Sequence, residues 1–296
     1  MREILDIIES LKAGEGGANG KSPVRDLGFI SCANTVHIRH VPFYDPCIIL
    51  VLTGKKVIFD QRGPVACNAG GVLTVPAPSS FDLRNEPDAR DRKYRALIIP
   101  FRHDLLEHLS RVHELHHESR NRDIRVLKFD GDDTLHASIR HYLDSVANRR
   151  LLTHRLMEIL LVLTGKNPEL LAYVLNQKSW SQRVRAILAT DLARSWEINE
   201  LCARLATTES TLRCNLKREN TGFRELLSDL RLSTALMQLL QTSRPAYQVA
   251  YDCGYQSVSR FSSNFHKRFG VPPRQFRESM DESEQSLDVS EHSLPA

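Results

Sequence analysis

The chain has 296 residues, more than the ~100–200 typical of one domain, so we expect two domains. Hydrophobic residues make up 41% of the chain and charged residues 26%, a balance that excludes a mostly disordered or fibrous protein. No apolar run approaches the ~18–20 residues that cross a bilayer, and the first residues lack the apolar stretch of a signal peptide. The six cysteines contain no C-x-x-C pair, so we expect reduced thiols in a cytoplasmic protein that meets no membrane.

The charge is distributed unevenly along the chain. The formal net charge is +4, from 40 basic and 36 acidic residues. Residues 179–279 hold 15 Lys or Arg against 9 Asp or Glu, whereas residues 280–296 hold 5 acidic residues and no Lys or Arg. A basic segment is compatible with a polyanionic partner, although a solvated helical face has the same composition. The acidic, serine-rich end cannot bury enough apolar surface to order itself, so we expect residues 280–296 to form a disordered tail.

The N-terminal part begins with one short helix and continues as strands. Residues 3–12 carry apolar side chains at helical spacing, and a glycine-rich break follows at residues 14–20. From residue 24 to residue 101, short apolar runs alternate with Gly, Pro, Asn and Asp, which predicts a small antiparallel barrel or sandwich. Within it, residues 47–53 and 57–60 flank a turn at Gly54 and predict a hairpin.

Three apolar stripes follow residue 102, where the pattern becomes helical. We expect the stripes to be buried under the strands, or one of them to face a second subunit; the sequence leaves both possibilities open. The stripes are Leu105, Leu106, Leu109 and Val112; Leu135, Ile139, Tyr142, Leu143 and Val146; and Leu156, Ile159, Leu160 and Leu163.

The segment from residue 183 to residue 279 is predicted to be almost entirely helical. Two parts of it repeat one layout, in which a short helix, a three-residue turn and a second helix follow one another. The turns are Ala206–Thr208 and Gly254–Gln256. This is the helix-turn-helix pattern, in which the first helix braces the second so that its exposed face can enter a major groove about 12 Å wide. The expected helices are 183–194, 197–205, 209–219, 223–241, 246–253, 257–269 and 273–279.

The second helix of the second motif separates apolar from polar side chains. Phe261, Phe265 and Phe269 are four residues apart, and we expect this stripe to be core rather than a platform for stacking bases. Gly254 suits a left-handed turn, and Ser257 can cap the helix that follows. The complementary face, which can meet DNA, carries Ser259, Arg260, Ser263, Asn264, Lys267 and Arg268.

Residues 183–279 resemble the DNA-binding domain of the AraC/XylS family of bacterial transcription regulators. The resemblance covers about a third of the chain and keeps its spacing throughout. It is carried by Leu201, Ala203, Leu205, Thr211, Leu212, Leu216 and Lys217, then by Arg231, Leu232, Ala235, Leu239 and Leu240, and finally by Val249, Ala250, Gly254, Tyr255, Phe261, Phe265, Phe269, Gly270, Val271, Pro272, Pro273, Phe276 and Arg277.

The resemblance implies that a long helix over residues 223–241 joins two subdomains whose recognition helices meet neighbouring major grooves, about 34 Å apart. The residues thereby offered to DNA are Glu209, Ser210, Arg213, Cys214, Lys217 and Arg218 in the first helix, and Ser257, Val258, Ser259, Arg260, Ser263, Asn264, His266, Lys267 and Arg268 in the second. We expect guanine contacts from Arg213 and Arg260, and phosphate contacts from Lys217, Arg218, Lys267 and Arg268. The alternative for each is a solvated surface charge.

Three positions depart from the family pattern. The family usually has glycine at the first turn, where this chain has Ala206, and a non-glycine residue in a left-handed turn costs roughly 1 kcal/mol. Cys214 stands where arginine is frequent in the first recognition helix, and Ser263 stands at the matching place in the second. We therefore expect a DNA-site preference private to this protein, and weak binding without a partner subunit.

The N-terminal half resembles the cupin-like sensor and dimerisation domain of the same family, over residues 41–56 and 68–76. A metal-binding cupin needs two histidines one residue apart, followed by a glutamate and a further histidine. His37 and His40 have the wrong spacing, and residues 41–101 contain no such set. The resemblance therefore implies an organic effector in any pocket, or no ligand, and neither a metal nor another cofactor.

Two other patterns are better explained without chemistry. Residues 14–22 imitate a phosphate-binding loop, but that pattern needs glycine where Glu15 stands and it follows a strand, so we expect a flexible connector. His113, His116 and His117 with Glu114 would offer a helical metal site, but no third ligand is identifiable and a solvated helix face is expected. The sequence contains no nucleophile elbow or other triad signature.

The sequence thus predicts an α+β protein with three parts. Residues 1–178 form a cupin-like antiparallel β-barrel with helices, residues 179–279 an all-helical domain with two helix-turn-helix motifs, and residues 280–296 the tail. We expect a sequence-specific DNA-binding transcription regulator, an activator, and not an enzyme. Its expected partners are promoter DNA, RNA polymerase, a second copy of the chain and an organic effector. The alternative is a cupin-type small-molecule binding protein or enzyme whose helical half only assembles it.

Overall fold

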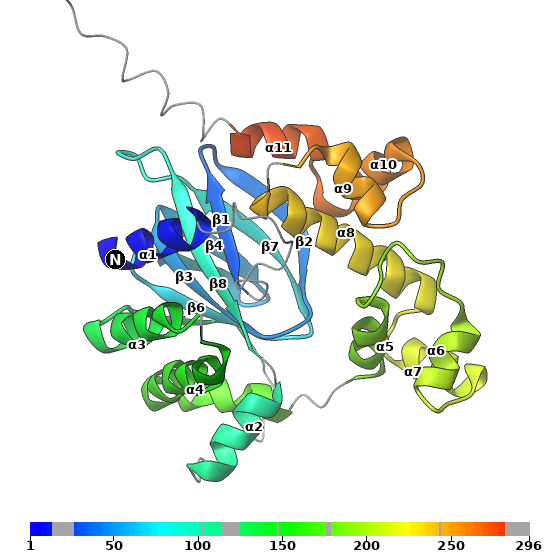
Figure 1. Cartoon of the computed structure of the whole chain (residues 1–296), viewed down its shortest axis with the longest axis horizontal. Coiled ribbons are helices and arrows are strands. Elements are labelled where there is room, and N and C mark those ends of the chain that lie inside the picture. Colours follow the sequence, from blue (N-terminus) through cyan, green and yellow to red (C-terminus); the bar gives the residue numbers. More distant parts are fainter. Residues whose placement is uncertain are drawn as a thin grey trace, which may run out of the picture. The chain divides into compact units, whose positions relative to one another are not determined.

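The computed structural model describes residues 1–13, 27–101, 103–113, 125–146, 148–175, 179–242 and 244–281. The chain divides into two compact units, and most of their elements are labelled in Figure 1. One unit is Met1–Thr35 with Phe43–Asn176, and the other is Val36–Pro42 with Gln177–Ala296. The boundary that the sequence places after residue 178 stays a prediction.

Some predictions fall partly or wholly outside the described residues. These are the connector at residues 14–22, the histidine site except for His113, and the tail beyond Asp281. Helix α11 (Pro273–Asp281) runs into the first residues of the predicted tail. Among the described helices, none has the length and hydropathy that spanning a bilayer requires.

The described strands form two antiparallel sheets. One sheet has the strand order β1-β8-β3-β6-β9, and the other has the order β2-β7-β4-β5. The strands are β1 (Gly28–Cys32), β2 (Val36–Phe43), β3 (Cys47–Thr53), β4 (Lys55–Asp60), β5 (Gly63–Asn68), β6 (Val72–Val75), β7 (Ser79–Glu86), β8 (Tyr94–Pro100) and β9 (Leu127–Phe129).

Both sheets are open. Strands β1 and β9 form the edges of one sheet and β2 and β5 the edges of the other, and no described strand of one sheet pairs with a strand of the other. A closed barrel requires every edge strand to find a partner. The predicted α+β class is confirmed, with one correction: the strands form two open sheets and not a single closed barrel.

The hairpin predicted around Gly54 is wrong. Strands β3 and β4 follow one another at Gly54 but lie in different sheets, and the hairpin is formed by β4 and β5. Gly54 has φ of +77°, and a Cβ there would lie 2.4 Å from the carbonyl oxygen of Glu86. Strand β3 is buried on both faces, so its continuous apolar run carries no alternation from which its partners could be read.

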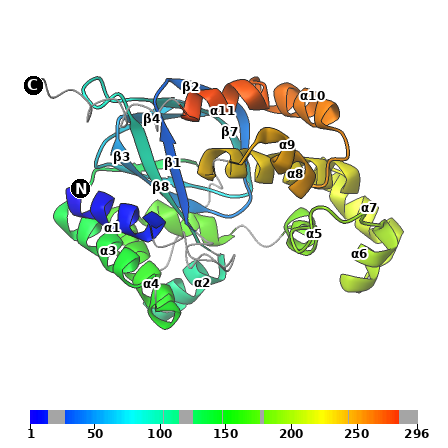
Figure 2. The ribbon, with the colours of Figure 1, turned by 45° about the horizontal axis from the view of Figure 1, so that its top comes forward.

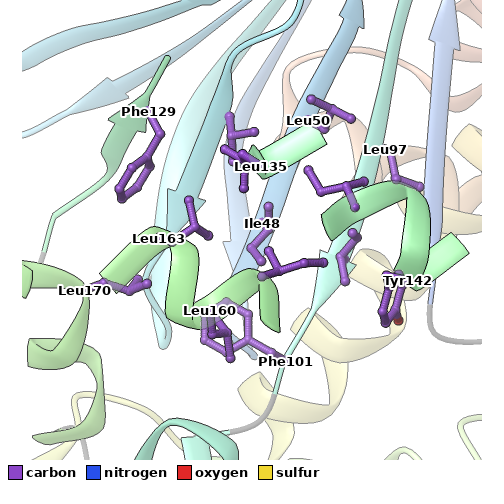
Figure 3. Close-up of a cluster of buried hydrophobic side chains, with 14 of the residues drawn as sticks. Ile48, Leu50, Leu97, Phe101, Phe129, Leu135, Tyr142, Leu160, Leu163 and Leu170 are labelled. Carbon is purple, nitrogen blue, oxygen red and sulfur yellow. The ribbon is translucent and has the colours of Figure 1, made fainter. Parts of the chain in front are cut away.

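The helices of this unit cover one face of the five-stranded sheet. Helix α3 packs between α1 and α4 (Figure 2). Ile48 and Leu50 of β3 and Leu97 of β8 meet the helices in one apolar cluster (Figure 3). The described helices here are α1 (Arg2–Ala13), α2 (His103–Val112), α3 (Asp133–Asp144), α4 (Arg149–Lys166) and the 3₁₀ helix η2 (Pro168–Leu175).

The three predicted stripes belong largely to this cluster. Its buried members include Leu106 and Leu109 of α2, whereas Val112 at the end of the same stripe is 56% exposed. The other buried stripe residues are Leu135, Ile139, Tyr142, Leu143, Val146, Ile159, Leu160 and Leu163. Burying a leucine or isoleucine side chain contributes roughly 1.5–3 kcal/mol, so these stripes stabilise the chain's own core.

A lysine is buried among polar side chains in the four-stranded sheet. Lys56 of β4 is 1% exposed, and its Nζ donates to Asn85 Oδ1 on β7 at 2.9 Å. Cys67 lies beside it on β5, and Nζ is 5.8 Å from the ring centroid of Tyr94. No carboxylate in the described part of the chain forms an ion pair with Lys56. Burial therefore lowers the pKa of Lys56 to about 8 and raises the pKa of Cys67 to about 11.

We expect Lys56→Met to stabilise the fold more at pH 7 than at pH 10. Between pH 8 and pH 10.5 Lys56 binds a proton in the unfolded chain but not in the folded one, so the contribution of Lys56 to stability becomes more favourable as the pH rises. The penalty for charging the buried amine, about 3 kcal/mol, is complete below pH 8 and fades towards pH 10.5. Urea unfolding of both proteins across this range measures the difference.

The neighbouring Lys55 provides the control. Its side chain is 40% exposed and pairs with Glu86 at 3.4 Å, an interaction worth at most about 1 kcal/mol. Lys55→Met should show no comparable trend with pH. A Lys56→Met stability difference that stays constant from pH 7 to pH 10 would contradict the assignment.

Candidate nucleic-acid interface

The second unit contains the predicted series of helices. They are α5 (Trp180–Leu188), α6 (Ile198–Arg204), α7 (Glu209–Arg218), α8 (Phe223–Gln241), α9 (Ala246–Asp252), α10 (Val258–Phe269) and α11 (Pro273–Asp281). The helix predicted at 183–194 is displaced: α5 begins at Trp180 because Ser179 and Gln182 form a capping box, and it ends at Leu188. The other helices agree with their predicted bounds to within two residues.

Helices α6 and α7 form the first helix-turn-helix. Ala206 in the turn between them has φ of +50°, so the left-handed conformation predicted for this alanine is present. The Thr208 side chain accepts a hydrogen bond from the Thr211 backbone N–H and caps α7. Leu212 and Leu216 are buried, which leaves the opposite face of α7 to solvent.

Helices α9 and α10 form the second helix-turn-helix. Gly254 in its turn has φ of +81°, and the Ser257 side chain accepts from the Arg260 backbone N–H to cap α10. Phe261, Phe265 and Phe269 are fully buried, and successive rings lie 5.5 and 4.7 Å apart. The prediction that this stripe is core is confirmed.

Helix α8 joins the two motifs. In Figure 1, α6 and α7 lie near the beginning of α8, and α9 and α11 lie near its other end. Helix α5 packs on both α7 and α8, whereas α9 and α11 pack on α8 and on one another. Each motif thus has its own support on a single connecting helix.

The residues predicted on the first recognition helix lie on its exposed side. Ser210, Arg213, Cys214, Lys217 and Arg218 are exposed, and Glu209 is half-buried. Arg213 is engaged with Glu209, since its Nη2 lies 2.6 Å from Glu209 Oε1. This pair is largely solvated, and an i,i+4 pair of that kind is worth ~0.3–0.5 kcal/mol, so a guanine could displace it at little cost.

The residues predicted on the second recognition helix fall into two groups. Ser257, Ser259, Arg260, Ser263, His266 and Lys267 are exposed, whereas Val258, Asn264 and Arg268 are half-buried. Arg268 Nε lies 3.6 Å from Asp229 Oδ1 of α8. Arg268 is therefore held towards the supporting helix, and Lys267 is the more exposed cation of the two.

Comparisons with known proteins agree with this geometry. Residues 201–279 match the family described as a helix-turn-helix domain. Two relatives from Escherichia coli, the HTH-type transcriptional activator CfaD and the DNA-binding dual transcriptional regulator Rns, are each 35% identical over 104 residues. The helical unit is therefore similar to the DNA-binding domains of AraC/XylS-family transcription regulators, and we call it the AraC-type domain. The matched stretch spans 35% of this chain and 39% of the length of each of these relatives.

The N-terminal half has its own match. Residues 46–173 match the family described as the ExsA N-terminal regulatory domain. Over 86% of its length, this chain has a fold similar to that of an apo variant of ToxT from Vibrio cholerae. The TM-score is 0.64, the sequence identity is 16%, and the match covers 97% of the ToxT chain. These matches give no support to the alternative of a cupin-type enzyme. No cluster of His, Cys, Asp and Glu suited to a metal ion occurs among the described residues.

The AraC-type domain also contains contacts that the sequence patterns did not predict. The Glu219 carboxylate, at the end of α7, accepts from the backbone N–H groups of Trp180 and Ser181 at 2.7 and 2.9 Å and so holds the start of α5. Tyr247 and Tyr251 of α9 are more than half exposed. Glu219 is one of many acidic residues in the sequence, and only the fold brings it to the N-terminus of α5.

The two turns of the AraC-type domain should respond differently to substitution. A Cβ on Gly254 would lie 2.5 Å from the Leu192 carbonyl oxygen, so Gly254→Ala adds a backbone clash to left-handed strain and should cost roughly 2 kcal/mol or more. Ala206→Gly relieves the left-handed strain but raises the conformational entropy of the unfolded chain. These two effects oppose one another, so the free energy of unfolding should change by no more than about 1 kcal/mol. Urea unfolding followed by tryptophan fluorescence measures both, because Trp180 and Trp196 both lie in this domain. Equal effects of the two substitutions would contradict this account.

Proposed function

We propose that the chain is a sequence-specific DNA-binding regulator of transcription, and that it activates its target promoters. The observation that carries the proposal is the pair of capped helices, α7 and α10, each buried on one face, polar on the other and mounted on one connecting helix. The description of its relative CfaD as a transcriptional activator supports activation as the direction of control.

Base contacts and phosphate contacts have different roles in this proposal. Arg213 and Arg260 are exposed guanidiniums on the polar faces, and a guanidinium can donate two hydrogen bonds to the O6 and N7 atoms of guanine. Lys217, Arg218 and Lys267 are proposed to contact phosphates, whose neutralisation supplies salt-dependent affinity without sequence preference. Specificity then rests on a few side chains and affinity on more of them.

The N-terminal unit is proposed to control this DNA binding. Its match to a regulatory domain supports a role in dimerisation and in sensing a small organic effector. ToxT, a protein of similar fold, has also been solved with an unsaturated fatty acid bound. Two linked copies would bind two sites with an effective concentration that compensates for weak binding by each copy. Recruitment of RNA polymerase in the cytoplasm completes the proposal.

Arg260→Ala and Lys267→Ala should weaken DNA binding in different ways. Loss of a base contact should relax preference at one base pair by ~1–3 kcal/mol, whereas loss of a phosphate contact should weaken binding to all sequences alike and reduce the salt slope by about 1. The two effects are separated by measuring affinity at several salt concentrations. The DNAs are a site selected from random sequences for binding to the wild-type protein, single-base variants of that site, and random DNA.

Arg274→Ala serves as the control for these substitutions. Arg274 is 90% exposed on α11, is paired with Glu278 and lies outside both recognition helices, so its loss should leave preference and salt slope unchanged. Equal losses on specific and random DNA for both Arg260→Ala and Lys267→Ala would refute the assigned roles. Failure of the wild-type protein to prefer any sequence would refute the function itself.

A further inference from the structure

An arginine in the middle of α8 holds the loop that leads into the first helix-turn-helix. Arg231 Nε donates to the carbonyl oxygen of Leu192 at 2.9 Å, and its Nη2 donates to the carbonyl oxygen of Arg194 at 3.0 Å. Both carbonyls belong to the loop between α5 and α6. A guanidinium presents several donors in one plane, so it fixes two carbonyl groups at once.

The same loop lies against the turn of the second helix-turn-helix. A Cβ added to Gly254 would lie 2.5 Å from the Leu192 carbonyl oxygen, 2.9 Å from the Ala193 Cα and 2.9 Å from Arg231 Nη2. The loop and the turn therefore touch backbone to backbone, with no room for a methyl group. We call this meeting point of Arg231, Gly254 and residues 192–194 the junction.

The loop is built to resist bending. Asp191 Oδ1 accepts from the backbone N–H groups of Ala193 and Arg194, both at 3.1 Å. The Trp196 indole N–H donates to the Asp191 carbonyl oxygen at 2.7 Å, and the guanidiniums of Arg194 and Arg204 each lie 5.0 Å from its ring centroid. These local contacts restrict the conformation of the loop, which lies between α8, the first motif and the turn of the second motif.

The second recognition helix is tied to α8 close to the same place. The ion pair between Arg268 of α10 and Asp229 of α8 lies two residues before Arg231 along α8. One short stretch of α8 thus contacts the loop before the first motif and the recognition helix of the second. Movement of either motif about α8 would have to break these contacts.

We propose that the junction sets the separation and angle between the two recognition helices of one chain. Each helix contacts one stretch of DNA, which we call a half-site, and Arg231 thereby determines which spacing of half-sites the protein accepts. This inference rests on the proposed function, since spacing matters only if both helices read DNA. Arg231 is a positioning residue in this account, because it acts through the loop and the turn. One inserted base pair moves the second half-site by ~3.4 Å and rotates it by ~35°, so a rigid pair of helices cannot follow it.

The first test compares DNA sites of altered spacing. The full-length wild-type protein should lose roughly 10–100-fold in affinity when one base pair is inserted between its half-sites, because one helix then faces the wrong bases. Arg231→Met removes the guanidinium and keeps an apolar stem. It should bind the original site more weakly, yet lose less than about threefold on insertion, since each motif can then adjust by itself.

Arg277 provides the matched control. Its guanidinium also donates to backbone carbonyls, those of Leu239, Thr242 and Arg244, but these groups all lie at the end of α8 and just beyond it. Arg277→Met should lower stability and leave the insertion penalty at the wild-type value. Arg231→Lys keeps the charge with a shorter reach, so it should fold well and show an intermediate penalty.

The second test needs no DNA. Cys214 on α7 is the exposed cysteine of the chain and the other cysteines are buried, so Cys214 and an introduced Ser263→Cys on α10 accept a pair of spin labels. The distance distribution between the labels should be narrow with the native junction and clearly broader with Arg231→Met. It should stay narrow with Arg277→Met.

The outcomes separate this inference from the proposed function. An unchanged distance distribution in Arg231→Met, or the same insertion penalty as the wild-type protein, overturns the junction's role. If the wild-type protein binds no DNA sequence preferentially, the proposed function fails and the role of Arg231 in half-site choice fails with it. The label distances would then still show whether the junction holds the helices together.

Discussion

Each recognition helix can face DNA only because its opposite face is buried. The phenylalanines of α10 and the leucines of α7 anchor the two helices in small cores, and the polar side chains are exposed as a consequence. Helices of 10 and 12 residues are marginal in isolation, so their order comes from this packing. The buried face therefore orders each helix, and the arginines and lysines of the exposed face are not needed for stability.

Much of the helical unit could be predicted because its signals are local. Helix α8 matches its predicted bounds, 223–241, since an amphipathic pattern lies between two turns that punctuate the sequence. The N-terminal strands were harder: both faces of β3 are buried, so no alternation shows which strand it pairs with. Helix α5 begins where Ser179 and Gln182 form a capping box, and the structure was needed to show that this box forms.

The contacts that organise the candidate site were beyond sequence reasoning for a different reason. Arg231, Glu219 and Arg277 all bind backbone groups more than 30 residues away. Every residue except proline has both a backbone N–H and a carbonyl, so the sequence does not show which of these groups a distant side chain will bind. The exposed faces of α7 and α10 could be predicted from periodicity, whereas the backbone contacts of Arg231, Glu219 and Arg277 could not.

The most direct test of the account is a hydroxyl-radical and methylation-protection footprint of the full-length protein on a selected site. Two helices set in neighbouring major grooves predict two windows of guanine N7 protection, centred about 10 base pairs apart on one side of the duplex. Protection confined to one major groove, or two windows on opposite sides of the duplex, would contradict the claim that both helices read DNA together.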